Sequence, residues 1–295
     1  RNSMVMKNYC YALLVLILAT THPLFSQNKS FDKSLRKIDA RYNAGSFSKA
    51  SSGLQKLKKS VVAKMGQQNT YMPGLNIREA RITLALGMLD GFDKSLESAL
   101  AASLATFGEN SANYAGTMLD VADSYNEYGN YRLSREYTAK AKELLTRTNQ
   151  LNEHLSARIG LIEAVAMTGQ GYCNEALALF KSLESYYAGR AVEKETIVEG
   201  GSIKSHRVPS EEIPQRYSDY AKLLTMTANA YGKKGSLISA DSAFGAAQNW
   251  IRKNQKYMGE TSLALVENRY LNAKMLIDNG NEEREKGLEF DNILS

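Results

Sequence analysis

The feature that most constrains the fold is a set of six small or aromatic residues at fixed spacings. These residues are Ala228, Tyr231, Gly235, Ala240, Phe244 and Ala247. On each side of the glycine they recur every three to four residues, so each half falls on one face of a helix. Small side chains let two helices approach closely, and the aromatic rings fill the space beside them. The pattern predicts an antiparallel helix pair over residues 221–254, with its turn at Gly235.

Partial copies of this pattern occur elsewhere in the chain. The copy at 115–148 has Ala122, Tyr125, Gly129, Tyr131 and Ala141, but Ser134 and Thr138 at two core positions. The copy at 157–190 has Ala164, Gly171, Ala176 and Phe180, with Met167 in the tyrosine position. Weaker copies are centred on Gly45, on Gly91 within 75–107, and on Gly280 after a start near 262. A repeated helix pair is the unit of a solenoid.

The distribution of proline favours an all-α class. The four prolines stand at 23, 73, 209 and 214, so long helices meet no breaker between 74 and 208. With its spaced alanines, aromatics and turn glycines, the chain resembles the tetratricopeptide repeat family over most of residues 31–295. The resemblance implies a right-handed superhelical solenoid of six helix pairs. A helical repeat of another family is the alternative, because the turn glycines lie further apart than the standard 34 residues.

The longest interval between turn glycines, 64 residues from Gly171 to Gly235, indicates an insertion at about 188–214. Two β-compatible runs, 193–198 and 203–208, flank the glycine-rich segment 199–202. This arrangement predicts a β-hairpin. Insertions in repeat proteins often lie on one exposed face, which can be the binding face. A mobile surface loop is the alternative.

Residues 1–26 have the pattern of a secretory signal peptide, with Lys7 before an apolar run at 10–19 and a small residue, Ser26, before the expected cut. The run is too short to span a bilayer. A buried first helix is the alternative. Residues 1–3 precede Met4 and suggest a non-native start, and the unfinished last helix pair suggests a truncated reading of a longer gene. Export to the periplasm or cell envelope follows, and cleavage would leave Cys173 as a lone, buried cysteine.

No catalytic spacing is found in the sequence. It contains no phosphate-binding loop, dinucleotide fingerprint or nucleophile elbow. After residue 26 there are two histidines, His154 and His206, and one cysteine, too few for a zinc site of these ligands. We therefore expect no enzyme activity, no cofactor and no metal. An enzyme with a helical-toroid active site would need clustered acids and histidines.

The charge is distributed unevenly. Ten basic and two acidic residues give residues 29–64 a charge of +8, whereas residues 65–295 carry −4. Lys56, Lys58 and Lys59 form the densest basic patch. This asymmetry favours an anionic partner surface, although a lysine-rich solvated helix face is the alternative. Nucleic acid is not expected, because no aromatics are interleaved with these lysines.

The resemblance also implies where a partner would bind. In the family, the first helices of the pairs line a concave groove that often holds an extended peptide or a helix. The positions of this sequence that match the groove are Asp123, Asn126, Lys222, Asn229, Lys233, Tyr270 and Lys274. The expected function is a non-catalytic protein–protein interaction scaffold of the cell envelope. The alternative is the extracytoplasmic sensor half of a truncated receptor or kinase.

Overall fold

The structure, a computed structural model, describes residues 29–199, 202–209, 212–258 and 263–284. The predicted signal peptide lies outside these residues. Residues 29–43 are helical. They are followed by α2 (Phe47–Met65), α3 (Met72–Ala85), η1 (Leu89–Gly91), α4 (Phe92–Phe107), α5 (Ala112–Tyr128), α6 (Tyr131–Arg147), α7 (Glu153–Gly169), α8 (Cys173–Arg190), β1 (Lys194–Glu199), β2 (Ser202–Arg207), α9 (Ile213–Lys233), α10 (Leu237–Met258) and α11 (Leu263–Arg284).

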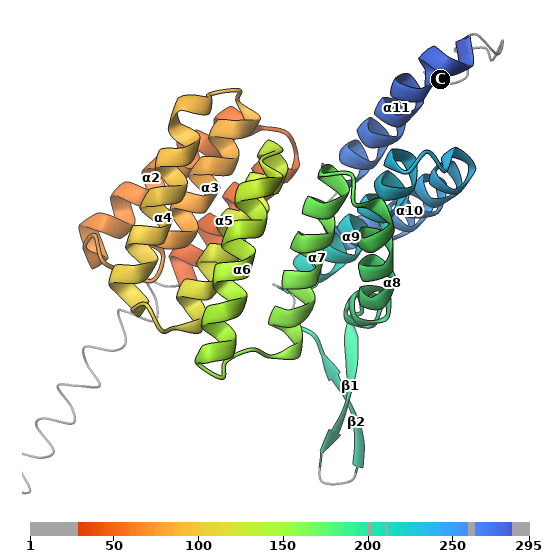
Figure 1. Ribbon diagram of the computed structural model, residues 1–295. Coiled ribbons are helices and arrows are strands. Elements are labelled where there is room, and N and C mark those ends of the chain that lie inside the picture. Colours follow the sequence, from red (N-terminus) through yellow and green to blue (C-terminus); the bar gives the residue numbers. More distant parts are fainter. Residues whose placement is uncertain (1–28, 200–201, 210–211, 259–262, 285–295) are drawn as a thin grey trace, which may run out of the picture.

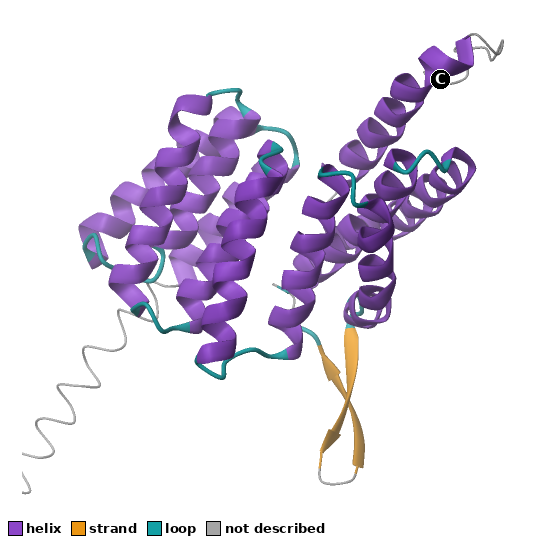
Figure 2. Cartoon of the chain, viewed as in Figure 1, coloured by secondary structure: helices purple, strands orange, loops and turns teal. Residues whose placement is uncertain are grey.

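The helices form a stack of antiparallel pairs (Figures 1 and 2). Within a pair, α3 packs on α4, α5 on α6, α7 on α8 and α9 on α10. Between pairs, the first helices contact one another in order: α3 with α5, α5 with α7, α7 with α9, and α9 with α11. Each element therefore packs mainly on its neighbours along the stack, which is the arrangement of a helical solenoid.

The core follows the same order, because each hydrophobic cluster joins one pair to the next. One cluster joins residues 29–43 to α2 and α3, another joins α5 and α6 to α7, and a third joins α7 and α8 to α9. The predicted small residues lie at these contacts. Ala228 and Ala247 are fully buried, as are Ala122, Ala164 and Ala176. The prediction that small residues permit close helix packing is confirmed.

The turns within pairs repeat one hydrogen-bonding motif. Gly129 and Gly235 have φ of 87° and 81°, a left-handed conformation that favours glycine. The residue after each glycine donates its N–H to a carbonyl five residues earlier: Asn130 to Tyr125 at 2.8 Å and Ser236 to Tyr231 at 3.0 Å. These are Schellman-type helix ends, and they reverse the chain sharply enough for the two helices to pack.

Two of the predicted turn glycines are wrong. The left-handed residue between α3 and α4 is Gly87, with φ of 71°, whereas Gly91 closes the short helix η1. Gly280 lies within α11, which continues to Arg284. A glycine inside a helix costs only about 1 kcal/mol relative to alanine, so glycine alone does not end a helix when its neighbours favour continuation.

The insertion contains the predicted β-hairpin. Strands β1 and β2 pair antiparallel, with Lys194 opposite Arg207 and Glu199 opposite Ser202, and the hairpin projects from the stack between α8 and α9 (Figure 1). Its base is fixed by Arg216 of α9. The guanidinium of Arg216 pairs with Glu195 of β1 and donates to Glu212 at 2.7 Å. The bounds agree with the predicted strands within one residue.

Candidate functional site

The candidate site is a charged network on one side of the row of first helices, centred on Asp123 of α5. One carboxylate oxygen of Asp123 accepts a hydrogen bond from Nζ of Lys222 at 2.6 Å, and the other accepts from Nη2 of Arg81 at 3.0 Å. Lys222 belongs to α9 and Arg81 to α3. The ammonium of α9 therefore reaches α5 past the intervening α7. The row must curve toward this side for that contact, so the network lies on its concave face.

The remaining acids of α5 complete the network. Asp120, Asp123 and Glu127 are spaced three and four residues apart and therefore share one face of the helix. Asp120 accepts from Nη2 of Arg158 on α7 at 2.6 Å, and Glu127 lies 3.5 Å from Arg81. One row of carboxylates thus binds cations from three other helices. We call Arg81, Asp120, Asp123, Glu127, Arg158 and Lys222 the groove network.

The electrostatics follow from partial burial beside these cations. Burial alone would raise the pKa of Asp123, but Lys222 and Arg81 outweigh it and lower the pKa to about 2. The carboxylate of Glu127 raises the pKa of the Arg81 guanidinium. Asp123 is therefore charged at every physiological pH, and it tethers α3 and α9 through ionic hydrogen bonds, which are stronger than neutral ones.

Two carboxylates beside the network, Asp219 of α9 and Glu267 of α11, add negative charge to the groove. Burial raises the pKa of Glu127 and of Glu267 on α11, and it raises the pKa of Asp219 on α9 to about 6. The Glu267 side chain is solvent-exposed, and its charge interacts with those of Lys222, Glu127 and Asp123. Within the part of the chain that the structure describes, neither Asp219 nor Glu267 has a cation at ion-pair distance. The groove is therefore acidic.

The raised pKa of Asp219 makes stability depend on pH. This pKa of about 6 lies above the usual 3.8 of an aspartate. The native chain therefore has the stability of the protonated acid below about pH 4 and loses that stability as the pH rises through 6. We expect Asp219→Asn to stabilise the protein at pH 8 by roughly 1 to 2 kcal/mol, after allowance for partial exposure, and to have little effect at pH 4. Urea melts at the two pH values measure this difference.

The matched control is Asp241→Asn, which changes an exposed acid on α10. As a substitution on the surface, it should change stability at pH 8 by less than about 0.5 kcal/mol. An Asp219→Asn effect that is the same at pH 4 and pH 8 would show that Asp219 does not titrate as described.

The structure brings together some of the predicted groove residues. Asp123 and Lys222 form the central ion pair, and Asn229, seven residues after Lys222, lies on the same side of α9. Asn126 is buried between helices, where Nδ2 donates to the carbonyl of Ile162 on α7 at 2.9 Å. Asn126 is therefore part of the packing between α5 and α7.

The other predicted residues lie away from Asp123. Lys233 is exposed at the end of α9, close enough to Cys173 to affect the pKa of that thiol. Tyr270 is exposed on the side of α11 opposite the buried Asn268, and Lys274 is exposed on the same flank of α11 as Glu267. Tyr270 thus points away from the groove network.

Three residues of the groove network were not predicted as a site: Arg81, Asp120 and Arg158. The nearby Asp219 and Glu267 were not predicted either. The segment 75–107 has few signature residues, so its register did not place Arg81 on the groove side. Arg158 stands at the second position of the copy at 157–190, which is a groove position in the family pattern. Applying that pattern to every copy would have found Arg158.

Only part of the predicted basic patch is available for contact with a partner. Lys56 and Lys59 on α2 are exposed, but Nζ of Lys58 lies 2.6 Å from Oε2 of Glu79 on α3. Lys58 therefore joins two helices, and Lys56 and Lys59 are the residues that a partner could contact.

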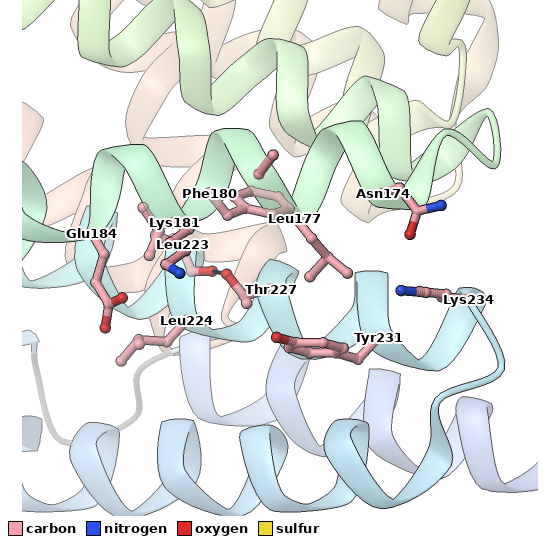
Figure 3. Close-up of a pocket in the computed structure, with 11 residues that line it drawn as sticks. Asn174, Leu177, Phe180, Lys181, Glu184, Leu223, Leu224, Thr227, Tyr231 and Lys234 are labelled. Carbon is pink, nitrogen blue, oxygen red and sulfur yellow. Dashed lines mark hydrogen bonds between the residues drawn. The ribbon is translucent and has the colours of Figure 1, made fainter.

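A second concave feature is a pocket of about 520 Å³ between α8 and α9 (Figure 3). Phe180 and Leu223 lie buried at its base. Lys181, Glu184 and Lys234 stand at its exposed margin, and these charges are of both signs. The pocket has the character of a shallow apolar depression between two helices.

Among the residues that the structure describes, no group of three or more histidines, cysteines or carboxylates is arranged to hold a metal ion. In the same residues, no helix combines the length and apolar character needed to cross a bilayer.

Antiparallel helix pairs, left-handed turn glycines and buried alanines recur along the stack. The fold is a tetratricopeptide-like solenoid.

No family model matches this sequence, and no curated protein matches it. Among solved structures, it is similar to a Podosopora anserina putative kinesin light chain with nearly identical TPR-like repeats, at 16% identity, covering 77% of this chain and 96% of that chain with a TM-score of 0.45.

A single-residue variant of that protein gives 16% identity, 78% and 96% coverage and a TM-score of 0.46. The chain is also similar to a Rap protein complexed with competence and sporulation factor, at 11% identity, covering 87% of this chain and 73% of that chain with a TM-score of 0.42.

Proposed function

We propose that this protein is a non-catalytic protein–protein interaction scaffold that holds a segment of a partner protein in its concave groove. The observation that carries the proposal is the groove network, in which ion pairs tie α3, α5, α7 and α9 together on the concave face. Such pairs fix the curvature of the stack. They form a preorganised surface, and preorganisation reduces the entropic cost of binding.

Within that surface, the side chains available to a partner are those that form no ion pair within the protein. Asn229 is partly exposed on the groove side of α9, and the carboxylate of Glu267 faces solvent. An asparagine side chain can donate to and accept from a peptide backbone. The unbalanced carboxylates favour a segment that carries lysine or arginine, because complementary charge steers association.

The basic face of the first pair offers a second contact. Lys56 and Lys59 lie on α2, outside the groove row, and face solvent. Here we propose contact with an anionic surface of the same partner. Binding through these lysines should weaken as salt shortens the Debye length from about 10 Å at 0.1 M to about 3 Å at 1 M.

We also propose that the protein works outside the cytoplasm, in the periplasm or cell envelope. The support is the sequence pattern of residues 1–26. Lys7 precedes an apolar run at 10–19, and the segment ends at the small residue Ser26.

Site-specific photo-cross-linking in the native host tests these points together. A photoreactive residue at position 229 reports on the groove, and one at position 142, exposed on α6, reports on the outer helices. We expect one protein to be captured from position 229 in the envelope fraction, and no capture of it from position 142. Mass spectrometry of the adduct identifies the partner segment.

In the same experiment, Lys56→Glu combined with Lys59→Glu should lower the yield of the adduct at low salt more than at high salt. Equal capture from positions 229 and 142 would contradict a groove site. Recovery of the chain only from the cytoplasm would contradict the envelope role.

A further inference from the structure

The outward face of the last described helix, α11, carries an apolar stripe. Val266, Tyr270, Ala273 and Ile277 follow one another at intervals of four, three and four residues, which places them on one side of the helix. Val266 and Tyr270 are each 61% exposed, and Ile277 is 53% exposed. Single exposed apolar residues are ordinary, but a contiguous stripe of them indicates an interaction surface.

The opposite face of α11 is packed against the rest of the protein. Asn268 is buried and donates to Thr225 of α9 at 3.3 Å, and Met275 lies against Gly232, where an added Cβ would come within 2.8 Å of its side chain. The stripe is therefore not the face by which α11 is held. Its side chains point away from α9 and α10.

The neighbours of α11 differ from those of the other first helices among the described elements. First helices inside the stack have a neighbouring first helix on each side: α5 lies between α3 and α7, and α9 lies between α7 and α11. Among the described elements, α11 packs mainly on α9 and α10, and its C-terminal part extends beyond the other ribbons (Figure 1). The stripe occupies the side where the next helix of such a row would pack.

The charges that flank the stripe indicate which helix fits. Glu267 and Lys274 lie seven residues apart on one flank, and Arg269 lies on the other, and all three are exposed. With Tyr270 and Ile277 in the a positions of a heptad and Val266 and Ala273 in the d positions, Glu267 and Lys274 both occupy e positions. In an antiparallel pair of helices, e positions of one helix face e positions of the other.

From this arrangement we infer that α11 binds the α11 of a second copy of this chain in antiparallel orientation. Glu267 of each copy then meets Lys274 of the other, and the two-fold symmetry forms this pair twice. Tyr270 packs on Ala273, and Val266 packs on Ile277. A parallel arrangement would instead bring e against g positions and place Arg269 beside Lys274, which is repulsive. The inference does not depend on the proposed groove function.

The size of the stripe sets the strength of the association. Four side chains along three turns of one helix bury far less than the roughly 1,600 Å² typical of a stable interface. The dimer should therefore be weak and depend on protein concentration.

Sedimentation velocity of the full chain over a hundredfold range of concentration tests the inference. We expect a monomer–dimer equilibrium in the wild-type protein. Tyr270→Lys, which places a charge at the centre of the stripe, should abolish the dimer. Glu267→Lys and Lys274→Glu should each weaken it by at least about tenfold, because each variant makes both e-position pairs repulsive.

A mixture of the two charge variants tests directly whether Glu267 of one copy meets Lys274 of the other. Glu267→Lys presents two lysines and Lys274→Glu presents two glutamates, so a one-to-one mixture should form a dimer that neither variant forms alone. Circular dichroism and thermal melts check that every variant folds. A wild-type protein that stays monomeric overturns the inference, as does a dimer that survives Tyr270→Lys or a mixture that associates no better than its components.

Discussion

Replacing Ala247 by glutamate should lower the free energy of unfolding by about 2 to 5 kcal/mol. Ala247 has no exposed surface, and it lies on α10, which packs along α9. The new side chain adds atoms where helices are in contact and buries a carboxylate. Either effect is costly, and both apply here. Urea denaturation followed by circular dichroism measures the change.

The neighbouring alanine provides a matched control. Ala246 is exposed on the same helix, so Ala246→Glu makes the same chemical change in contact with water. Its effect should lie within about 0.5 kcal/mol of zero. If Ala247→Glu were as mild as Ala246→Glu, the helix faces assigned to this pair would be wrong.

Removal of the central acid of the groove network should also be strongly destabilising. Asp123→Ala leaves Lys222 and Arg81, both largely shielded from solvent, without the carboxylate that joins them. Breaking a buried ion pair by removing one partner typically costs 3 to 5 kcal/mol, and because these side chains retain some exposure we expect about 2 to 3 kcal/mol. Urea denaturation of the single variant measures this loss.

Two further variants separate the ion pair from general damage. Lys222→Met in the Asp123→Ala background removes a cation that has lost its carboxylate. It should restore about 1 kcal/mol of the free energy of unfolding. Glu136→Ala breaks the exposed pairs with Arg132 and Lys140 on α6 and should change stability by less than about 0.5 kcal/mol. If Asp123→Ala cost no more than Glu136→Ala, the network would not hold the groove together.

The helix pairs were predictable because their signature is local. Ala228, Gly235 and Ala240 lie within a dozen residues of one another, and helix periodicity alone places the two alanines on facing sides. The hairpin was predictable for the same reason, since two β-compatible runs flank a short glycine turn. The sequence signal failed at Gly280, where a glycine identical in type to the turn glycines lies inside α11.

The groove was predicted only in outline. The family pattern placed Asp123 and Lys222 on groove-facing positions of separate repeats, but it did not indicate that they pair. It also placed Tyr270 with them, whereas the observed rotation of α11 turns this residue to the outward face. The last copy lacks most signature residues, so its register could not be fixed from the sequence.

What the sequence by itself determined is the repeating unit: helices that begin and end at given residues, the close contacts made by alanine, and the turns made by glycine. These depend on interactions between residues less than one repeat apart. Only the tertiary structure decided which charges meet. Lys222 reaches Asp123 across 99 residues, because small rotations between successive pairs add up to a curvature that no single repeat encodes.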